Sequence, residues 1–197
     1  MADGRLPDRG RPLPSAALPS VVLASRSPQR RAILEQLGVA FTVVVPDVEE
    51  REDGDPVELV TENALRKVRA VPGELVLGVD TTVVLDGRSF GKPADEDEAR
   101  RTLELLSGRA HEVWSGIAVR RGGEEATAAA RTGVRFRTLE PGLMGWYLSS
   151  GEWRERAGGY AIQGRGAALV ESIEGDFWNV VGLPVPELLR LLPDLLG

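Results

Sequence analysis

Short apolar runs alternate with amphipathic segments along this chain, and the first two predict a strand followed by a helix. Residues 21–24 form a continuous apolar run, which is typical of a buried strand. The run stops just before Ser27, which suits an N-cap, and Pro28, which suits the first turn of a helix. Apolar residues at helical spacing follow as far as Gly38, a residue type that commonly ends a helix. The beginning of the chain therefore predicts a strand, a tight turn and a helix.

The same alternation continues to the end of the chain. Pro56 predicts the start of a second helix that runs to about Val71. A buried strand over residues 75–79 is expected to end at Asp80, and the later pair Asp86-Gly87 predicts a hairpin with a type I′ turn. Further strands are expected at residues 41–45, 111–120, 126–138 and 168–173, and further helices at 95–107, 141–149 and 186–192. This order, with an antiparallel pair in the middle, indicates an α/β fold with a mixed sheet.

The length and the first residues predict one folded domain behind an extension. A chain of 197 residues suits a single core, and neither a repeat nor a linker divides it. The first eighteen residues are rich in Pro, Gly and Arg and lack the apolar core of a secretory signal. We interpret residues 1–18 as a disordered extension and residues 19–197 as the domain. Since no apolar stretch approaches the roughly 20 residues of a membrane span, we expect a soluble cytoplasmic protein without a membrane partner.

The composition limits the chemistry that the chain can support. It has no cysteine, so disulfides and thiolate metal sites are excluded, and its only histidine is His111. A zinc site is close to excluded, because zinc takes several nitrogen or sulfur ligands. Any metal must be held mainly by oxygen, which indicates magnesium or manganese. The net charge of −6 argues against a nucleic-acid partner.

The segment Ser25 to Arg31, between the first strand and helix, is a candidate anion site. Backbone N–H groups at a helix N-terminus attract anions, and Arg30 and Arg31 add positive charge. The serine hydroxyls could donate to phosphate oxygens. The alternative is a capped helix with solvated arginines, which is the commoner arrangement when this feature is taken alone.

Three further segments carry candidate chemistry. Asp80 is placed where catalytic carboxylates of α/β proteins collect, although a turn aspartate is equally compatible with its position. Lys92 lies between Gly91 and Pro93, where an ammonium suits a phosphate, although a lysine in a loop is more often simply solvated. The acidic connector, residues 47–55, could supply one metal ligand or be a solvated loop. For His111 a structural hydrogen bond is favoured over general-base work.

Six motifs in order resemble the Maf family of nucleoside triphosphate pyrophosphatases, from about residue 20 to residue 190. They are L-A-S-R-S-P-Q-R-R from residue 23, G-V-D-T from 78, G-K-P from 91, L-S-G-R-A-H-E-V from 106, G-E-W-R-E-R-A-G-G-Y-A-I-Q-G from 151 and N-V-V-G-L-P from 179. The resemblance implies a single domain of two lobes around a mixed sheet flanked by helices, like that of the inosine triphosphatases. It also implies cleavage between the α and β phosphates, a divalent metal (Mg²⁺ or Mn²⁺) and a homodimer.

The resemblance also assigns expected roles to residues. Asp80 corresponds to the catalytic proton acceptor. Phosphate contacts are implied for Ser25, Arg30, Lys67 and Lys92, and metal-side carboxylates for Glu49 or Glu50, with Glu155 as a further candidate. Thr81 and Gln163 fall where family members select the base and are similar to the group that acts on dTTP and UTP. Gln29, at another specificity position, departs from the arginine typical of that group.

Two other functions compete with the enzyme. The first is a non-catalytic regulator of septum formation that acts through protein partners, because the family has been linked to cell division. The second is a nucleic-acid-binding module, against which the acidic net charge argues. The enzyme is favoured, and a regulatory role could coexist with it.

Overall fold

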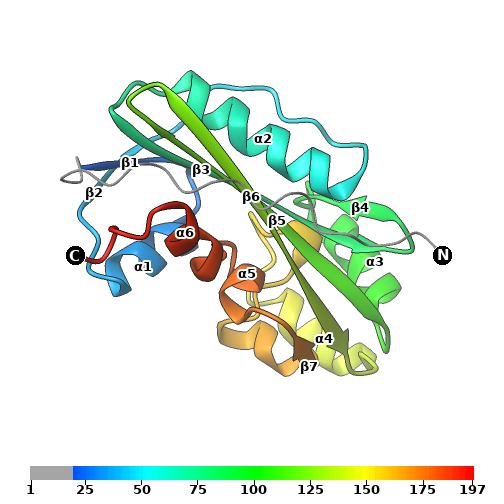
Figure 1. Ribbon diagram of the computed structural model, residues 1–197. Helices are drawn as coiled ribbons and strands as arrows, with labels where there is room; N and C mark the ends of the chain where they lie inside the picture. The colour runs from blue at the N-terminus through cyan, green and yellow to red at the C-terminus, as the bar shows by residue number, and fades with distance from the viewer. Residues whose placement is uncertain (1–19) are drawn as a thin grey trace. The chain divides into compact units, whose positions relative to one another are not determined.

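The computed structural model describes residues 20–197, and the predicted extension at residues 1–18 lies outside the described residues. The strands form a seven-stranded mixed sheet in the order β2-β1-β3-β5-β6-β7, with β4 paired to β3 (Figure 1). The strands are β1 Val21–Ala24, β2 Phe41–Val44, β3 Leu75–Leu85, β4 Arg88–Phe90, β5 Ala110–Arg121, β6 Glu124–Phe136 and β7 Val170–Glu174. The predicted α/β class with a mixed sheet is confirmed.

Most of the helices begin and end close to the residues that the sequence predicts. The α-helices are α1 Pro28–Gln36, α2 Pro56–Ala70, α3 Glu96–Leu106, α4 Pro141–Leu148, α5 Phe177–Val181 and α6 Val185–Leu191, and two 3₁₀ turns are η1 Ala157–Gly159 and η2 Gly164–Ala168. Ser27 caps α1 and Asp55 caps α2, as expected. The short helix α5 was not expected. Between residues 20 and 197, no helix combines the length and apolar character that crossing a membrane requires.

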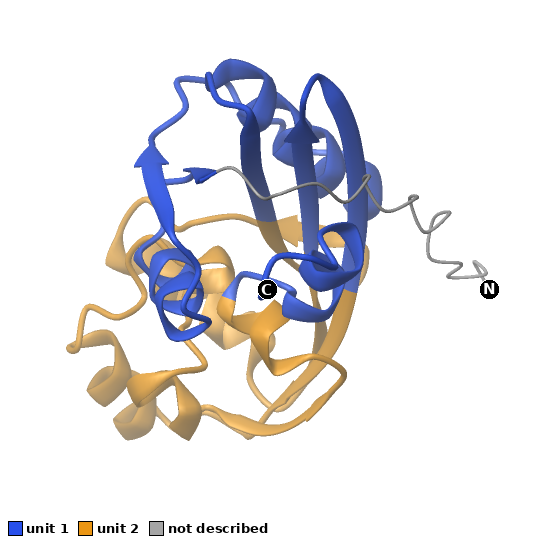
Figure 2. Ribbon diagram, turned by 60° about the vertical axis from the view of Figure 1, so that its left-hand side comes forward, with its two compact units in different colours: residues 1–80, 115–130, 182–197 blue, residues 81–114, 131–181 orange. Residues whose placement is uncertain are grey.

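The fold divides into two compact units, each made of several chain segments (Figure 2). The described part of the first unit comprises residues 20–80, 115–130 and 182–197, and the second unit comprises residues 81–114 and 131–181. β3, β5 and β6 each contribute residues to both units, so three of the four passages of the chain between the units lie inside strands. The fourth follows α5, between Val181 and Gly182.

The first unit is built around β1, which lies between two parallel neighbours. Val21 pairs with Phe41 of β2 and with Leu75 of β3. Helix α2 covers one face of these strands, and α1 and α6 lie on the other (Figure 1). Side chains on the α2 face form a small buried core: Ala24, Ala64, Val68, Val71, Val76 and Ala118.

Two glycines let α2 lie unusually close to the strands of the first unit. A Cβ atom on Gly78 would lie 2.6 Å from the carbonyl oxygen of Ala64. One on Gly116 of β5 would overlap the backbone of Val60. Any larger residue at either position would push the helix away, and with it the polar side chains that α2 carries toward β3.

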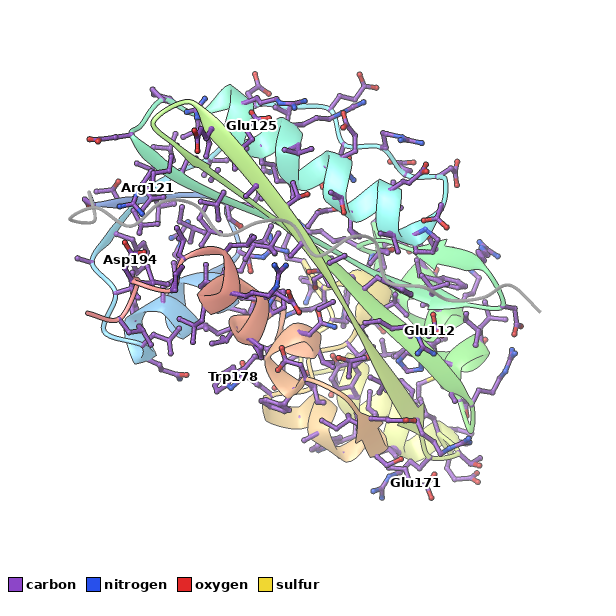
Figure 3. The ribbon with its side chains drawn as sticks, viewed as in Figure 1. Glu112, Arg121, Glu125, Glu171, Trp178 and Asp194 are labelled. Atoms are coloured by element: carbon purple, nitrogen blue, oxygen red, sulfur yellow. The ribbon has the colours of Figure 1, made fainter. Side chains whose placement is uncertain are left out.

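The C-terminal segment of the first unit is fastened by an ion pair. Arg121, at the end of β5, lies 3.2 Å from a carboxylate oxygen of Asp194 (Figure 3). The side chains of both residues are largely buried. Removing either partner would therefore leave a charge in a poorly solvated place.

The second unit has the larger of the two cores described here, which includes Phe136, Tyr147, Trp153 and Tyr160. The hairpin from β3 to β4 turns at Asp86 and Gly87, whose φ angles of 52° and 76° match the predicted type I′ turn. At the surface of this unit Glu112 pairs with Arg131, a residue of β6 (Figure 3).

The expectation that the strand ends at Asp80 is wrong. β3 runs without a break from Leu75 to Leu85, so that Asp80 lies inside it. Asp80, Thr81 and Thr82 form a polar interruption in the apolar pattern, and the pattern alone therefore indicates an end. The strand continues because partners buried with it satisfy Asp80, and because threonine is well suited to β structure.

Candidate active site

A buried ion pair between α2 and β3 forms the centre of the candidate site in the first unit. The ammonium of Lys67 lies 2.7 Å from Oδ1 of Asp80 and 3.2 Å from Oε2 of Glu50. It also donates to the carbonyl oxygen of Val79 at 3.2 Å. The ammonium thus donates two hydrogen bonds, to Asp80 and Val79, and forms an ion pair with Glu50. The planar guanidinium of an arginine could not reproduce this arrangement.

The strand pattern explains why Asp80 faces Lys67. Side chains alternate between the two faces of a strand, so Val76, Gly78 and Asp80 share the face that α2 covers. The neighbouring strand β1 ends at Ala24, whose partner is Gly78. Asp80 therefore lies two residues beyond the last pair. Although it is inside β3, it lies past the carboxyl end of β1, a place where ligands of α/β folds collect.

The surroundings of Asp80 keep its carboxyl group ionised. Burial alone would raise the pKa of Asp80, but the charge and hydrogen bond of Lys67, the hydrogen bond from Asn63 and the charge of Arg30 together hold it below its usual range. A carboxylate in this state accepts hydrogen bonds and does not donate them. Asp80 is thus available as an acceptor throughout the neutral range.

Arg30 and Ser25 bring a second cationic group to this part of the first unit. The Nη1 atom of Arg30 donates to the hydroxyl oxygen of Ser25 at 3.1 Å, and its Nε atom donates to the carbonyl oxygen of Gly182 at 2.8 Å. Burial lowers the pKa of Arg30, and the charges of Asp80 and Glu50 oppose this effect. The guanidinium is therefore held in place next to an acidic group. Arg30 is thus buried and hydrogen-bonded, and is not the solvated arginine that the alternative interpretation expected.

The backbone at the start of α1 forms a turn around two serine hydroxyls. The hydroxyl oxygen of Ser25 accepts from the N–H of Ser27 at 3.1 Å in addition to Arg30, so its own hydrogen points elsewhere. The hydroxyl of Ser27 accepts from the N–H of Arg30 at 3.5 Å and donates to the amide oxygen of Gln29 at 3.2 Å. Gln29 thus lies at the helix N-terminus, within the segment that the sequence indicated as an anion site.

Asn63 is part of the cluster, and sequence reasoning missed it. Its Nδ2 atom donates to Oδ2 of Asp80 at 3.0 Å, opposite the oxygen that Lys67 holds. The sequence does contain a signal for it. Asn63 and Lys67 are four residues apart on α2, so they share a helix face, and both fall at positions of the buried apolar stripe. Two polar residues on such a stripe indicate a buried polar partner.

The acidic connector contributes Glu50 to the cluster, whereas Glu49 contributes mainly backbone. The carbonyl oxygen of Glu49 accepts from Arg66 at 3.0 Å, and its side chain is exposed. Within residues 20–197 there is no group of three or more histidine, aspartate or glutamate side chains that could hold a metal. Glu50 does reach the cluster through its ion pair with Lys67, and one or two carboxylates together with substrate phosphates are the usual ligands of Mg²⁺.

The second unit holds the other predicted site residues. Lys92 pairs with Glu155, its ammonium 2.9 Å from Oε2, and both side chains are exposed. The backbone on either side of the pair is also joined, because the N–H of Gly158 donates to the carbonyl oxygen of Gly91. A carboxylate paired with a lysine in solvent is a weak metal ligand on its own. The assignment of Glu155 to a metal stays a prediction.

Gln163 and Thr81 also belong to the second unit. Gln163 is exposed and precedes η2, and the chain around it is held by Glu152, which accepts from the N–H of Arg165 at 2.9 Å. Tyr147 holds the preceding residues by accepting from the N–H of Ala161 at 3.0 Å. Thr81 directly follows Asp80 in β3. The roles of both residues in selecting a base stay predictions.

His111 is a structural residue, as expected. Its Nε2 atom lies 2.9 Å from the hydroxyl oxygen of Tyr160, and its ring packs edge-on against Phe136 and Tyr160. Burial lowers the pKa of His111 to about 4, so the ring is neutral at physiological pH.

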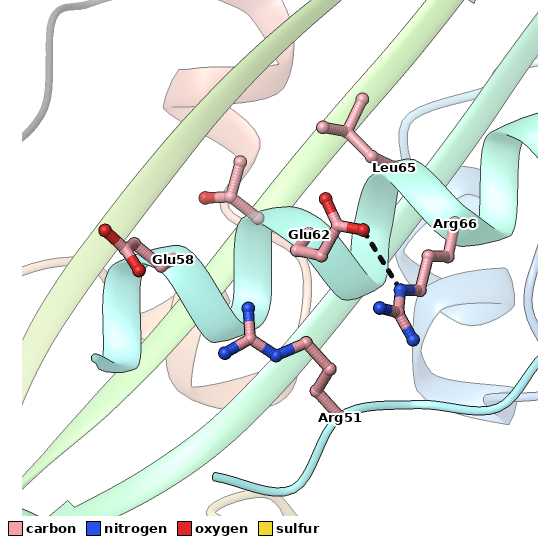
Figure 4. A pocket seen from close by; sticks show the side chains of 6 residues that line it. Arg51, Glu58, Glu62, Leu65 and Arg66 are labelled. Atoms are coloured by element: carbon pink, nitrogen blue, oxygen red, sulfur yellow. Dashed lines mark hydrogen bonds and ion pairs between the residues drawn. The ribbon is translucent and has the colours of Figure 1, made fainter. Parts of the chain in front are cut away.

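A separate hollow lies on the outer side of α2 and does not coincide with the cluster. Its volume is about 460 Å³ (Figure 4). Its lining residues are Arg51, Glu58, Thr61, Glu62, Leu65 and Arg66. None of the residues predicted from the sequence to contact substrate lines this hollow, so we exclude it from the candidate site.

Comparison with known proteins identifies the family. The family model described as "Maf-like protein" matches residues 20–195. A dTTP/UTP pyrophosphatase of Symbiobacterium thermophilum is 49% identical over 178 residues, which cover 87% of this chain and 92% of that protein. Proteins of the same name from Anaeromyxobacter dehalogenans strain 2CP-1 and Pyrococcus furiosus are 48% and 42% identical, covering 88% and 87% of this chain and 93% of each relative. The chain belongs to the Maf family.

Proposed function

We propose that this protein is a nucleoside triphosphate pyrophosphatase that hydrolyses dTTP and UTP to the monophosphate and pyrophosphate. Relatives that align with most of this chain carry the name dTTP/UTP pyrophosphatase. The observation that carries the proposal is the buried, ionised Asp80 held between Lys67 and Asn63 and close to Arg30. Removal of dTTP, UTP or modified nucleotides is a house-cleaning activity, and we place it in the cytoplasm, in a homodimer.

In this proposal the cationic side chains neutralise the phosphates. A water molecule approaches a triphosphate only when the negative charge of its oxygens is balanced. Arg30 and Ser25 contact phosphate oxygens at the start of α1, where backbone N–H groups also favour anions. The bond from Lys67 to the half-exposed Glu50 is the one most readily exchanged for a phosphate oxygen. Lys92 is the fourth proposed phosphate contact.

Asp80 is the proposed proton acceptor. The oxygen of water forms a bond to the α phosphorus, the bond from that phosphorus to the bridging oxygen breaks, and pyrophosphate leaves with the electron pair. The proton of the water passes to the carboxylate of Asp80. Because Lys67 and Asn63 each hold one of its oxygens, the carboxylate has a fixed orientation and still offers a lone pair to the water.

We further propose a divalent cation, Mg²⁺ or Mn²⁺, with Glu50 or Glu49 as the carboxylate that would hold it. A carboxylate oxygen suits a cation that also binds substrate phosphates. When bound, such a cation supplies additional positive charge to the triphosphate and to the departing pyrophosphate. Glu155 is a further candidate carboxylate for this cation.

The preference for a base is assigned to Gln29, Thr81 and Gln163. Thr81 directly follows Asp80, and the amide of Gln29 is held by Ser27. An amide and a hydroxyl can both pair with the carbonyl and N–H groups of a pyrimidine such as thymine or uracil. A Gln29→Arg variant tests whether this position tunes the base.

The proposal is tested with the purified protein and a panel of canonical and modified triphosphates, with Mg²⁺ or Mn²⁺ and after chelation. We expect monophosphate and pyrophosphate from dTTP and UTP, and none after chelation. In water enriched in oxygen-18, the label should enter the monophosphate, because attack occurs at the α phosphorus. Release of orthophosphate, label in the pyrophosphate, or no turnover of any triphosphate would contradict the proposal. The regulatory alternative instead predicts binding to a division protein that survives Asp80→Asn.

A further inference from the structure

Asn63 joins two parts of the candidate site that are distant in the sequence. Its side chain bonds both to Asp80 in β3 and to the backbone of Arg51 in the acidic connector. We propose that Asn63 is a positioning residue that fixes the connector and Asp80 relative to each other, so that Glu50 and Asp80 meet at Lys67. This inference rests on the proposed function, because it concerns the geometry of that same reaction.

The orientation of the Asn63 amide follows from its partners. Its Oδ1 atom accepts from the N–H of Arg51 at 2.8 Å, and its Nδ2 atom donates to the carbonyl oxygen of Arg51 at 2.9 Å. The opposite orientation would place donor against donor and acceptor against acceptor. The second N–H of Nδ2 then necessarily faces Asp80. The two hydrogen bonds with the backbone of Arg51 thus orient the amide so that its donor, and not its acceptor, faces Asp80.

Helix α2 holds three successive residues of the connector. Arg66 donates to the carbonyl oxygen of Glu49, Lys67 pairs with the side chain of Glu50, and Asn63 takes both backbone groups of Arg51. The first two contacts are at least partly exposed, whereas Asn63 is only 2% exposed.

Burial decides which of these contacts holds the connector. An ion pair with a half-exposed partner such as Glu50 contributes little to stability, because water competes for both charges. The paired hydrogen bonds of a buried amide are costly to leave unmade. We therefore infer that Asn63 fixes the position of the connector. The connector in turn brings the carboxylate of Glu50 to the ammonium of Lys67.

The same amide limits rotation of the Asp80 carboxylate. Lys67 holds Oδ1 and Asn63 holds Oδ2, so the plane of the carboxylate is defined by two donors on one helix. With Asn63 removed, Oδ2 of Asp80 loses this donor. Its pKa should then rise, because one of the contacts that favours the ionised form is lost while its burial remains.

Two variants and one control test the inference. Asn63→Ala removes all three hydrogen bonds, and Asn63→Asp keeps the size but places a carboxylate against Asp80. Gln36→Glu is the matched control, because it makes the same change from amide to carboxylate at an exposed position of α1. Thermal unfolding shows which variants fold. If Asn63→Ala does not fold, the same measurements are made on Asn63→Asp.

With dTTP as substrate, we expect kcat of Asn63→Ala to fall about 10–100-fold, as for other residues that orient a catalytic group. The concentration of Mg²⁺ needed for half activation should rise, because Glu50 is no longer placed. The acid limb of the profile of kcat/KM against pH should move to higher pH, more for Asn63→Asp than for Asn63→Ala. Gln36→Glu should match the wild type in all three measurements.

Two measurements without substrate separate the inference from the proposed function. Carbon-13 NMR follows titration of the Asp80 carboxyl, and hydrogen exchange follows the N–H of Arg51. In Asn63→Ala the titration should move to higher pH, and the Arg51 N–H should exchange faster. If the wild type hydrolyses no triphosphate, the proposed function is wrong. The Asp80 titration and the exchange of the Arg51 N–H still test the positioning role of Asn63. An unchanged Asp80 titration and unchanged exchange in a folded Asn63→Ala would overturn the positioning role.

Discussion

The two lysines of this chain, Lys67 and Lys92, make similar contacts in very different surroundings. Each pairs with a carboxylate, at 2.7 Å from Asp80 and at 2.9 Å from Glu155. The side chains of the first pair are 6% and 12% exposed, and those of the second are 51% and 65% exposed. A buried pair cannot lose one partner without leaving a charge in a place that water does not reach, whereas solvent replaces an exposed partner easily. Distance alone therefore does not distinguish a constitutive contact from an exchangeable one.

The difference assigns distinct tasks to the two regions. In the proposed reaction, Lys67 of the first unit keeps Asp80 charged and oriented. Lys92 of the second unit exchanges the exposed Glu155 for a phosphate. The proposed reaction needs both behaviours, a fixed acceptor and an exchangeable cation. The following experiments test this contrast, from the largest expected effect to the smallest.

Asp80→Asn should have the largest effect. It keeps the shape of the side chain but removes the proton acceptor, so turnover of dTTP should fall by about 10²–10⁴-fold, the usual contribution of a general base. Asp86→Asn is the matched control, because Asp86 lies in an exposed turn with a φ angle of 52° that asparagine tolerates. Steady-state release of pyrophosphate measures both. Full turnover in a folded Asp80→Asn would reject the role given to Asp80.

Lys67→Met should destabilise the protein strongly. It leaves the buried Asp80 without its cation, and breaking a buried pair in this way costs about 3–5 kcal/mol. Urea denaturation followed by tryptophan fluorescence gives the free energy of unfolding. The double variant with Asp80→Asn should recover part of the loss, because the stranded charge is gone. If Lys67→Met lowers the free energy of unfolding by less than Lys92→Met does, the two ion pairs do not differ as we infer.

Acid should destabilise the second unit through His111. Burial lowers the pKa of His111 to about 4 in the folded protein, from 6.5 in the unfolded chain, so the unfolded chain binds the proton more readily. Stability is therefore fully present above pH 6.5 and falls as the pH drops toward 4, by about 3 kcal/mol in total. Denaturation at a series of pH values measures this slope.

The comparison variant for that measurement is His111→Gln. It removes the titrating ring, so the decrease between pH 6.5 and pH 4 should become shallower even if the variant is less stable overall. The pKa of Asp80 is also lowered, but a lowered carboxyl pKa gives stability that is lost only at more acidic pH. An identical slope in both proteins would show that His111 does not control this range.

Lys92→Met should change binding but hardly change stability. The KM for dTTP should rise about 10–100-fold, because a charge-assisted hydrogen bond contributes about 1.5–3 kcal/mol. The free energy of unfolding should change by less than about 1 kcal/mol, as for other exposed pairs. Amine-reactive labelling gives an independent reading, since Lys92 should react much faster than Lys67 and be protected by nucleotide. Equal labelling of the two lysines would contradict the assignment.

Glu155→Gln should have the smallest effect. Loss of an exposed pair costs about 0–1 kcal/mol, and removing a competitor for Lys92 should lower the KM for dTTP slightly. If Glu155 instead holds the metal, the Mg²⁺ concentration for half activation must rise. This variant therefore separates the two roles, and the Mg²⁺ dependence of activity is the measurement that decides.

Features with a local cause were determined by the sequence. Ser27 and Pro28 begin α1, Asp55 caps α2, and Asp86-Gly87 forms the type I′ turn, all as predicted. Each depends on the hydrogen bonds or dihedral angles of a few consecutive residues, so the residue types alone specify it. The family resemblance likewise implies roles for Ser25, Arg30, Lys67 and Asp80.

Only the tertiary structure decided how these residues meet. The polar residues after Val79 indicated the end of a strand, but β3 continues because Asn63 and Lys67 satisfy Asp80 inside it. The sequence pattern did not predict a role for Asn63, because its partners Arg51 and Asp80 lie 12 and 17 residues away along the chain. Those contacts exist because Gly78 lets α2 pack closely on β3. A pattern of residues records local preference, whereas the burial that makes a charge pair permanent or exchangeable arises only when distant segments pack together.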